Sequence, residues 1–426
     1  MEIFKNDVDW HNESLWFVRE KRDIASSKLE EWEDLRQRAS QIKSHTLSKL
    51  DYYLEEFEKN CKRNGIVVHW AVDGDELCSI VEQICSAKKA KKILKSKSML
   101  TEECGLNPYL QKAGYEVIDT DLGERIVQLN HEPPSHIVLP AIHLKKGDVA
   151  KIFEQNSGDA TYLTRYAREN LRSEFLSCDV AISGVNFGVV DEGCFVVCTN
   201  EGNADLATSL CDTHIACMGI EKLVPKLQDL GIFTRLLARS ATGQAITTYT
   251  THFKKPAPSK EIHLIITDNG RSDLLGRDDF ENALKCIRCG ACMNTCPVFR
   301  RVGGHSYSYT IPGPIGVNLG ASRDIEKYGK MSFASTLCGS CTNVCPTKID
   351  LHHQLLAYRN EYKKVVKEQK DTLYILAYRV LKSDFLYKSV MKIAKYIPYR
   401  VYKNLWGEGR VTPKVAKKSF RELWDE

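Results

Sequence analysis

The stretch CIRCGACMNTCP, residues 286–297, decides the fold of the C-terminal part of this chain. Its cysteines follow the pattern C-x2-C-x2-C-x3-C-P, which is the spacing of bacterial ferredoxins. Gly290 lets the backbone pass close to inorganic sulfur, where amide donors stabilise negative charge. Pro297 sets the chain direction after the last cysteine. The spacing therefore predicts an iron–sulfur module with four ligands here: Cys286, Cys289, Cys292 and Cys296.

A second run, SFASTLCGSCTNVCP at residues 332–346, has the spacing of the last three cysteines of such a pattern. The missing first cysteine falls at Ser335. If the usual cross-pairing of two runs holds, each run lends its last cysteine to the other cluster. Cluster one then takes Cys286, Cys289, Cys292 and Cys345, and cluster two takes Cys296, Cys338 and Cys341.

The fourth ligand of cluster two stays open at this point. Ser335, water, a residue from elsewhere, or no ligand at all are the alternatives, and the last would give a three-iron cluster. Paired C-x2-C motifs also bind zinc. Two proline-terminated runs favour two 4Fe-4S clusters over zinc.

Length and composition describe an ordinary globular protein. The 426 residues suffice for two or three domains, and the formal charge is only +5. No apolar run could span a bilayer and no signal sequence opens the chain, so we expect a cytoplasmic protein without transmembrane segments. Nucleic-acid binding is not expected, because no such motif is found. Nine cysteines outside the cluster region are expected to be mostly reduced, buried thiols: Cys61, Cys78, Cys85, Cys104, Cys178, Cys194, Cys198, Cys211 and Cys217.

Before the cluster region the apolar pattern changes once. Residues 1–60 have helical spacing and are expected to cap the following domain. From residue 61 to 270, short apolar runs alternate with helical stretches such as 75–89 and 101–113, which indicates a mostly parallel α/β sheet. The strand candidates are 66–68, 92–94, 117–118, 136–139, 180–182, 194–197 and 262–266.

Polar residues follow several of these predicted strands. Ligands of parallel sheets bind at the carboxyl ends of strands, so these residues could hold an anionic or carboxylate-bearing ligand. Helix caps and turns are the alternative interpretation. His131, His136, His143 and His214 lack metal-ligand spacing and are interpreted as ordinary histidines. The candidates are Lys95, Ser96, Lys97, Ser98, Glu102, Glu103, Asn186, Asp191, Glu192, Thr199, Asn200, Glu201, Gly202 and Asn203.

Fingerprints of other cofactors and catalysts are missing from the sequence. We find no G-x-G-x-x-G after a strand, no phosphate-binding P-loop and no G-x-S-x-G. After the clusters, residues 350–367 are predicted to be helical, and an apolar face continues between lysines until Pro398. With Trp406 and Trp424 among basic residues, this end is expected to dock on a partner subunit rather than on lipid.

The chain as a whole resembles the lactate-utilisation protein B family. Besides the cysteine runs, the resemblance is carried by HTLSKLDYYLEEFE (45–58), KSKSMLTEE (95–103), DLGERIVQLNHEPPSHIVLPAIH (121–143), SGVNFGVVDEGCFVVCTNEGNADL (183–206), HIACMGIEKLVP (214–225), RSATGQ (239–244) and DNGRSDLL (268–275). One local difference is DEGC at 191–194, where relatives tend to have Glu-Thr-Gly-Thr.

This resemblance implies a domain plan and a role. It implies an α/β domain of the LUD type, related to the ribose-5-phosphate isomerase and CoA-transferase fold, followed by an α-helical two-cluster ferredoxin domain. It also implies L-lactate oxidation to pyruvate with two partner proteins, one cysteine-rich and one a single-domain LUD relative. The expected divisions are 1–60, N-terminal helices; 61–270, LUD-type domain; 278–360, ferredoxin-type domain; and 361–426, basic helical tail.

Two other functions fit the same residues. The chain could be a self-sufficient isomerase or CoA-transferase-like catalyst that uses Glu192 or Glu201, with clusters that only sense redox state. Alternatively, it could be a scaffold whose clusters merely staple the C-terminal domain. The absence of cofactor fingerprints favours an electron-transfer subunit.

Overall fold

The computed structural model describes residues 8–366, 371–394, 418 and 420–424. Two compact units divide the chain, at 1–362 and 363–426. The predicted N-terminal helices, α/β domain and cluster-binding domain all belong to the first unit, so they pack on one another and form one body.

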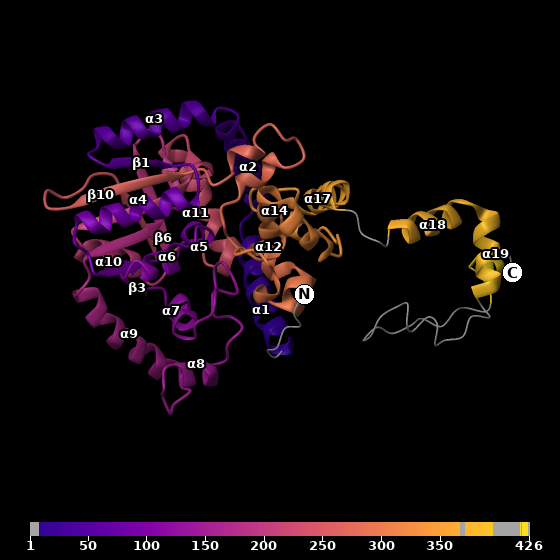
Figure 1. The fold of residues 1–426 in the computed structure, drawn as a ribbon, viewed down its shortest axis with the longest axis horizontal. Helices are drawn as coiled ribbons and strands as arrows, with labels where there is room; N and C mark the ends of the chain where they lie inside the picture. The colour runs from indigo at the N-terminus through magenta and orange to yellow at the C-terminus, as the bar shows by residue number, and fades with distance from the viewer. Residues whose placement is uncertain (1–7, 367–370, 395–417, 419, 425–426) are drawn as a thin grey trace. The chain divides into compact units, whose positions relative to one another are not determined.

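A six-stranded sheet, parallel throughout, is the centre of the first unit (Figure 1). Its middle strand β7 is buried along its whole length, because helices cover both faces. In spatial order the strands are β1 (Val67–Ala71), β10 (Glu261–Thr267), β7 (Thr213–Gly219), β4 (Val180–Gly184), β2 (Lys92–Lys95) and β3 (Glu116–Asp119).

Side chains of β7 alternate between two apolar cores, as the period of two in a strand requires. Ile215 and Cys217 pack with α4, α5 and α6, whereas Ala216 and Met218 pack on the opposite face with α3 and β6. The helices between the strands are α4 (Gly74–Ala87), α5 (Met99–Glu103), α6 (Leu106–Lys112), α7 (Leu122–Leu129), α8 (Lys146–Ile152), α9 (Ala160–Leu176) and α10 (Asn203–Leu210).

A smaller four-stranded sheet lies beside the first, in the order β8, β5, β6, β9. β6 pairs antiparallel with β5 and β9, and β8 pairs parallel with β5. Helix α11 packs its apolar residues, including Phe233, against Phe187 of β5. The elements are β5 (Phe187–Val189), β6 (Cys194–Thr199), β8 (Leu223–Val224), β9 (Tyr249–Phe253) and α11 (Leu227–Thr242).

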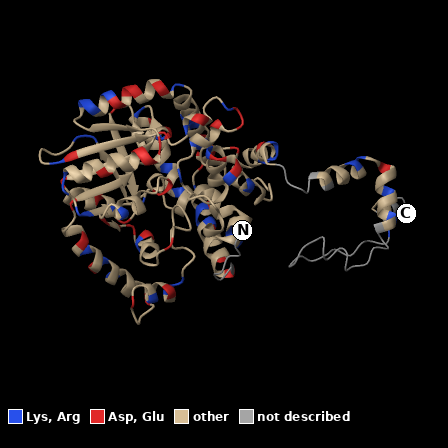
Figure 2. Ribbon diagram, viewed as in Figure 1, with Lys and Arg blue, Asp and Glu red and all other residues tan. Residues whose placement is uncertain are grey.

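The N-terminal helices are α1 (Val8–Ser27), α2 (Trp32–Leu47) and α3 (Leu50–Arg63). Only α3 lies on the large sheet, beside β1, and Figure 2 shows its acidic residues followed by basic residues at its C-terminal end. α1 contacts α11 on one side and the cluster-binding helices on the other. Arg22 donates a hydrogen bond to the carbonyl of Val344 at 3.0 Å. The N-terminal helices, which were predicted to cap the α/β domain, therefore also pack against the cluster-binding domain.

The cluster-binding domain is helical, as predicted. One short helix lies within each cysteine run, and α17 closes the unit with Tyr358 buried against Phe280. The helices are α12 (Ala291–Thr295), α13 (Pro297–Val302), α14 (Gly313–Arg323), α15 (Ile325–Tyr328), α16 (Ser340–Val344) and α17 (Leu351–Val365). The 3-10 helices of the unit are η1 (Ile220–Lys222), η2 (Ser272–Leu274), η3 (Glu281–Lys285), η4 (Gly304–Ser306) and η5 (Gly329–Phe333).

The second unit contains α18 (Asp371–Lys382), α19 (Asp384–Ala394) and α21 (Phe420–Trp424). Large apolar side chains on α18 and α19 are exposed, among them Leu381 and Phe385. Pro398 and Trp406, which we singled out from the sequence, lie outside the described residues. None of the helices in the described ranges combines the length and apolarity needed to cross a bilayer.

Two sequence expectations are corrected. Residues 136–139 form a loop and no strand, because Pro133, Pro134 and Pro140 around them lack backbone donors. The predicted helix 101–113 is two helices, α5 and α6, separated at Gly105, whose φ is +68°.

The nine cysteines outside the cluster region are mostly free thiols, as expected. Cys178 and Cys211 are the exception, because they form a disulfide with their Cα atoms 6.2 Å apart.

Candidate functional site

The two cysteine runs fold into the same local shape. Arg288 and Leu337, one residue before the second cysteine of the full pattern, have φ of 60° and 53°. Gly290 and Gly339 both have φ of 77° and are the N-cap residues of α12 and α16. These two helices lie side by side. The backbone around the second cysteine of the full pattern is therefore alike in the two runs.

Four thiols border one small cavity between the runs: Cys286, Cys289, Cys292 and Cys345. Its other walls are apolar and include Ile137 of the α/β domain. The backbone N–H of Arg288 points to Cys286 Sγ at 3.4 Å, and that of Ile349 to Cys345 Sγ at 3.3 Å. Burial raises the pKa of the Cys292 thiol, and its cysteine neighbours add to this. Four sulfur donors, an apolar shell and N–H···S bonds suit an iron–sulfur cluster.

The remaining three thiols form a second group. Burial, Cys296 and Cys338 together raise the pKa of Cys341 to about 12. Backbone amides of Val298 and Phe299 donate to Cys296. Of this group only Cys338 is exposed. The three sulfurs suit three corners of a cluster, as expected from the sequence, and ligation by either group stays a prediction.

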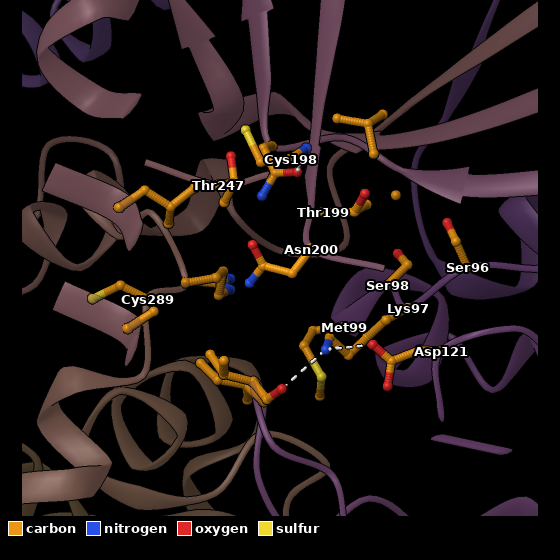
Figure 3. A pocket seen from close by; sticks show the side chains of 18 of the residues that line it. Ser96, Lys97, Ser98, Met99, Asp121, Cys198, Thr199, Asn200, Thr247 and Cys289 are labelled. Carbon is orange, nitrogen blue, oxygen red and sulfur yellow. Dashed lines mark hydrogen bonds and ion pairs between the residues drawn. The ribbon is translucent and has the colours of Figure 1, made fainter. Parts of the chain in front are cut away.

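A cavity of about 470 Å³ opens in the α/β domain at the carboxyl ends of β2, β4 and β7. This volume is in the range of small-molecule sites. Figure 3 shows Lys97 in its wall, donating to Asp121 at 2.9 Å and to the carbonyl of Val138 at 3.0 Å. Cys289 lies on the other side of the same view, across from Asp121. The cavity of the α/β domain therefore touches the loop that is predicted to bind cluster one.

A buried ionic network joins this cavity to the cluster loop. Arg271 pairs with Glu103 at 2.8 Å and with Glu221 at 2.9 Å. Arg288, which stands between Cys286 and Cys289, also reaches Glu221 at 3.4 Å. Burial would raise the pKa of Glu221, but the cations, Arg271 first, lower it to about 2. Glu221 therefore stays ionised and holds both arginines in place.

Two lysines lie near Arg288 and the predicted ligand Cys286. Lys43 donates to the carbonyl oxygens of Glu221 and Leu223, and burial lowers its pKa to about 7. Lys222 lines the cavity, and burial, with Arg288, lowers its pKa to about 8. Across the described ranges, no side chain or carbonyl forms a hydrogen bond or ion pair with the Lys222 ammonium, which leaves it available to an anion.

Comparison with known protein families finds separate matches for the α/β domain and the cluster-binding domain. The LUD domain family matches residues 54–274, and the 4Fe-4S dicluster domain family matches residues 282–349. Lactate utilization protein B of Shouchella clausii (strain KSM-K16) is 41% identical, over 95% of this chain and 90% of the relative. That of Macrococcus caseolyticus (strain JCSC5402) is 45% identical, over 83% of this chain and 76% of the relative.

The chain belongs to the lactate utilization protein B family. A solved DUF162 family protein from Deinococcus radiodurans, 10% identical, covers 51% of this chain and 98% of its own with a TM-score of 0.30. That likeness is too distant to support any statement about the fold. The family relationship therefore depends on the sequence comparisons, and it confirms the resemblance found from the motifs.

In this member of the lactate utilization protein B family, most of the polar strand-end candidates line the cavity. Glu192 does not, because it lies in the turn between β5 and β6 and pairs with Lys254. Asp191 and Glu102 are also outside the cavity wall. The candidates that line it are Ser96, Lys97, Ser98, Glu103, Asn186, Thr199, Asn200, Glu201 and Asn203.

Other cavity residues were missed from the sequence. Glu221 follows β7, which was not predicted as a strand from the sequence, whereas Arg271 follows the predicted strand 262–266 and lies in the stretch after it that was not considered as a site. Arg288 lies inside the cysteine motif itself, and the cysteine spacing alone gives no sign that its side chain lines the cavity. Lys95, which we had grouped with its neighbours, is fully buried behind the cavity with Glu102, Asp119 and Glu124.

Proposed function

We propose that this chain is the iron–sulfur electron-transfer subunit of a cytoplasmic complex that oxidises L-lactate to pyruvate. Membership of the lactate utilization protein B family and the two groups of thiols support this role. Iron–sulfur clusters, when bound, pass electrons one at a time. The chain's own residues would position the electron donor, shield it from water and hold the cluster beside it.

The observation that carries the proposal is the contact between the cavity and the cluster-one loop. Cys289 and Arg288 form part of the cavity wall, together with strand-end residues of the α/β domain. A molecule in the cavity would therefore lie next to the electron acceptor. Lys222 and Arg288 would attract a carboxylate, and the neighbouring serines and asparagines would orient its polar groups.

The proposed partners are the two that the family resemblance implies, a cysteine-rich protein and a single-domain LUD protein. We further propose that the α/β domain is related to the ribose-5-phosphate isomerase and CoA-transferase fold, supported by its six parallel strands. Two 4Fe-4S clusters, with the second incompletely ligated, complete the proposal.

Gene deletion tests this role in the cell. Growth on L-lactate as carbon source should be lost and growth on pyruvate retained. Complementation with the wild-type gene should restore growth on L-lactate, whereas Cys289→Ala should not. Undiminished growth of the deletion strain on L-lactate would contradict the proposal.

A purified sample tests whether the chain acts as a subunit. Protein isolated without oxygen should show no turnover of L-lactate with an artificial electron acceptor when it is alone. Turnover should appear when the two partners are added. Full activity of the chain by itself would exclude the subunit role.

A second candidate is a self-sufficient catalyst that uses Glu201. One observation favours it: Glu201 lines the cavity, and burial, with Asp121, raises its pKa. A carboxyl group with a raised pKa keeps its proton more readily and is a candidate general acid or base. Glu201→Gln should then abolish isomerase or CoA-transfer activity of the isolated chain, and an absence of such activity in the wild type would dismiss this candidate.

A further inference from the structure

Three side chains outside the cavity meet at the junction of the α/β and cluster-binding domains. Glu132 and His143 belong to the loop that follows α7, and His305 belongs to η4 of the cluster-binding domain. One ligand atom from each lies within 4.8 Å of the other two. His143 Nε2 is 2.8 Å from Glu132 Oε1, and the two imidazole rings are 4.7 Å apart.

Ser135 can orient His143 for metal binding. Its hydroxyl lies 2.9 Å from the carbonyl oxygen of Pro140 and 2.7 Å from His143 Nδ1. When the hydroxyl donates to Pro140, its oxygen accepts from Nδ1–H, and the lone pair on Nε2 faces the Glu132 carboxylate. A metal ion between Nε2 and the carboxylate would then satisfy both, whereas a proton on Nε2 makes the same contact an ordinary hydrogen bond.

His305 is arranged in the same way. Its Nε2 lies 2.8 Å from the carbonyl oxygen of Pro133, which can only accept, so Nε2 carries the proton and Nδ1 has the lone pair. Each imidazole therefore has one nitrogen fixed by an oxygen acceptor and the other free to bind a metal. This is the usual arrangement around metal-ligating histidines.

We propose that Glu132, His143 and His305 bind a zinc ion, with water as the fourth ligand. Two histidines and one glutamate are an established zinc donor set. Zinc bonds of about 2.0–2.2 Å place tetrahedral ligands roughly 3.3 Å apart. His143 and Glu132 need to separate by only about half an ångström for this geometry, and the exposed side chain of His305 can close the third side.

Such an ion would join the two domains. The backbone of η4 already lies against this loop, because a Cβ at Gly304 would come within 1.8 Å of the Ser135 carbonyl oxygen. The same loop carries Ile137, which borders the cavity of cluster one, and Val138, which packs against Gly290. The zinc ion therefore stabilises the loop that borders the cavity of cluster one, and it is not a ligand of that cluster.

The test uses full-length protein whose clusters have been reconstituted without oxygen, so that iron occupies the cysteines. One equivalent of zinc is added, unbound metal is removed, and zinc and iron are counted by mass spectrometry. The wild type should keep about one zinc per chain. Its X-ray absorption should show only nitrogen and oxygen ligands near 2.0–2.2 Å, with no sulfur near 2.3 Å.

Variants identify the ligands. Glu132→Gln and His305→Ala should lower zinc affinity at least tenfold, without changing iron content. His353→Ala is the matched control, because His353 is another exposed histidine bound to a carboxylate, that of Asp350, and with Asp350 and His352 it forms a competing group of possible metal ligands. It should keep the zinc. Zinc should also raise the melting temperature of the wild type and the control, but not that of the two ligand variants.

Three results would overturn the proposal. They are a wild type that retains no zinc, zinc bound through sulfur, and ligand variants that retain as much zinc as the control. Any of them would mean that a proton, shared by His143 and Glu132, accounts for their short contact.

Discussion

Ser335 stands where the second cysteine run lacks a ligand. Its hydroxyl accepts a hydrogen bond from the backbone N–H of Leu337 at 3.1 Å, and its carbonyl accepts one from Arg359 at 2.7 Å. Both bonds shape the turn that leads to Cys338. Serine is a poor iron ligand unless the metal itself removes its proton. Three thiols alone would leave one iron of cluster two labile.

We expect the wild type to lose this iron in air and to show a three-iron signal by electron paramagnetic resonance. Ser335→Cys should suppress the signal by supplying the fourth thiolate. Cys338→Ala and Cys341→Ala should damage cluster two, and Cys345→Ala cluster one. Two four-iron clusters that survive air, in the wild type and in Ser335→Ala, would show that Ser335 serves only the turn.

A second residue-scale feature is the fully buried ammonium of Lys95. It lies 2.8 Å from Glu102, 2.9 Å from Asp119 and 3.7 Å from Glu124. Burial, with the nearby carboxylates, raises the pKa of Glu124 to about 8, although Lys95 opposes the shift. Glu124 is therefore protonated in the folded protein at pH values where the unfolded chain has released that proton.

The sign of the pH effect follows from this difference. Between about pH 4.5 and 8 the folded state binds more protons than the unfolded state, so the free energy of unfolding falls as pH rises. Glu124→Gln should make this decline shallower, as measured by denaturant unfolding from pH 6 to 9. Exposed Glu116→Gln should keep the wild-type slope. Parallel curves for Glu124→Gln and the wild type would contradict the assignment.

At the scale of elements, the two cysteine loops allow a matched comparison. Gly290 and Gly339 share a φ of 77°, so alanine costs each about 1–2 kcal/mol in backbone strain. At Gly290 the new Cβ would also lie 3.0 Å from His136 Cε1 and 3.1 Å from Val138 Cγ2. At Gly339 its nearest neighbour, His352, is 3.8 Å away.

Gly290→Ala should therefore lower the melting temperature and the iron content more than Gly339→Ala. The excess measures the contact between the α/β loop and the loop of cluster one. Thermal unfolding and iron analysis of the two variants check this. Equal losses of melting temperature and iron content in the two variants would mean that the loop of His136 and Val138 moves away from the added methyl group without cost.

The sequence was informative where a local pattern has one physical solution. Cysteine spacing placed the cluster loops, and most apolar runs became strands of the parallel sheet. It failed for β7, whose run contains His214 and Gly219, and for residues 136–139, where flanking prolines outweigh the apolar pattern. The junction of Glu132, His143 and His305 was not foreseen, because His305 lies far along the chain from the loop of Glu132 and His143 and only folding brings it there.

At the scale of the whole molecule, the second unit carries exposed apolar side chains between basic residues. Tyr362 is buried in the first unit and Glu361 pairs there with Arg277, so a clean division falls at the end of α17. A truncation designed from the sequence alone would end near Asn360. The structure indicates that it should end after Val365 instead.

Truncation after Val365 should leave the clusters and the melting temperature unchanged, because the first unit stays complete. Co-purification with the two proposed partners should weaken at least tenfold, since exposed apolar helices with basic flanks suit a protein surface. Pull-down from cells that express all three proteins measures this. Sedimentation of the intact chain with anionic liposomes at moderate salt would instead point to lipid.

The position of α1 sets the order of events during biosynthesis. Arg22 is made 322 residues before Val344, its partner, and Leu15 is buried in a core completed by cluster-domain residues. At about 5–20 residues per second, the ribosome needs roughly 15 to 65 s to make that intervening chain. Throughout this interval the apolar face of α1 lacks its final neighbours. α1 can therefore complete its packing only after the last cysteines have left the ribosome. Cluster insertion and the final folding step of the first unit then take place at the same stage of biosynthesis.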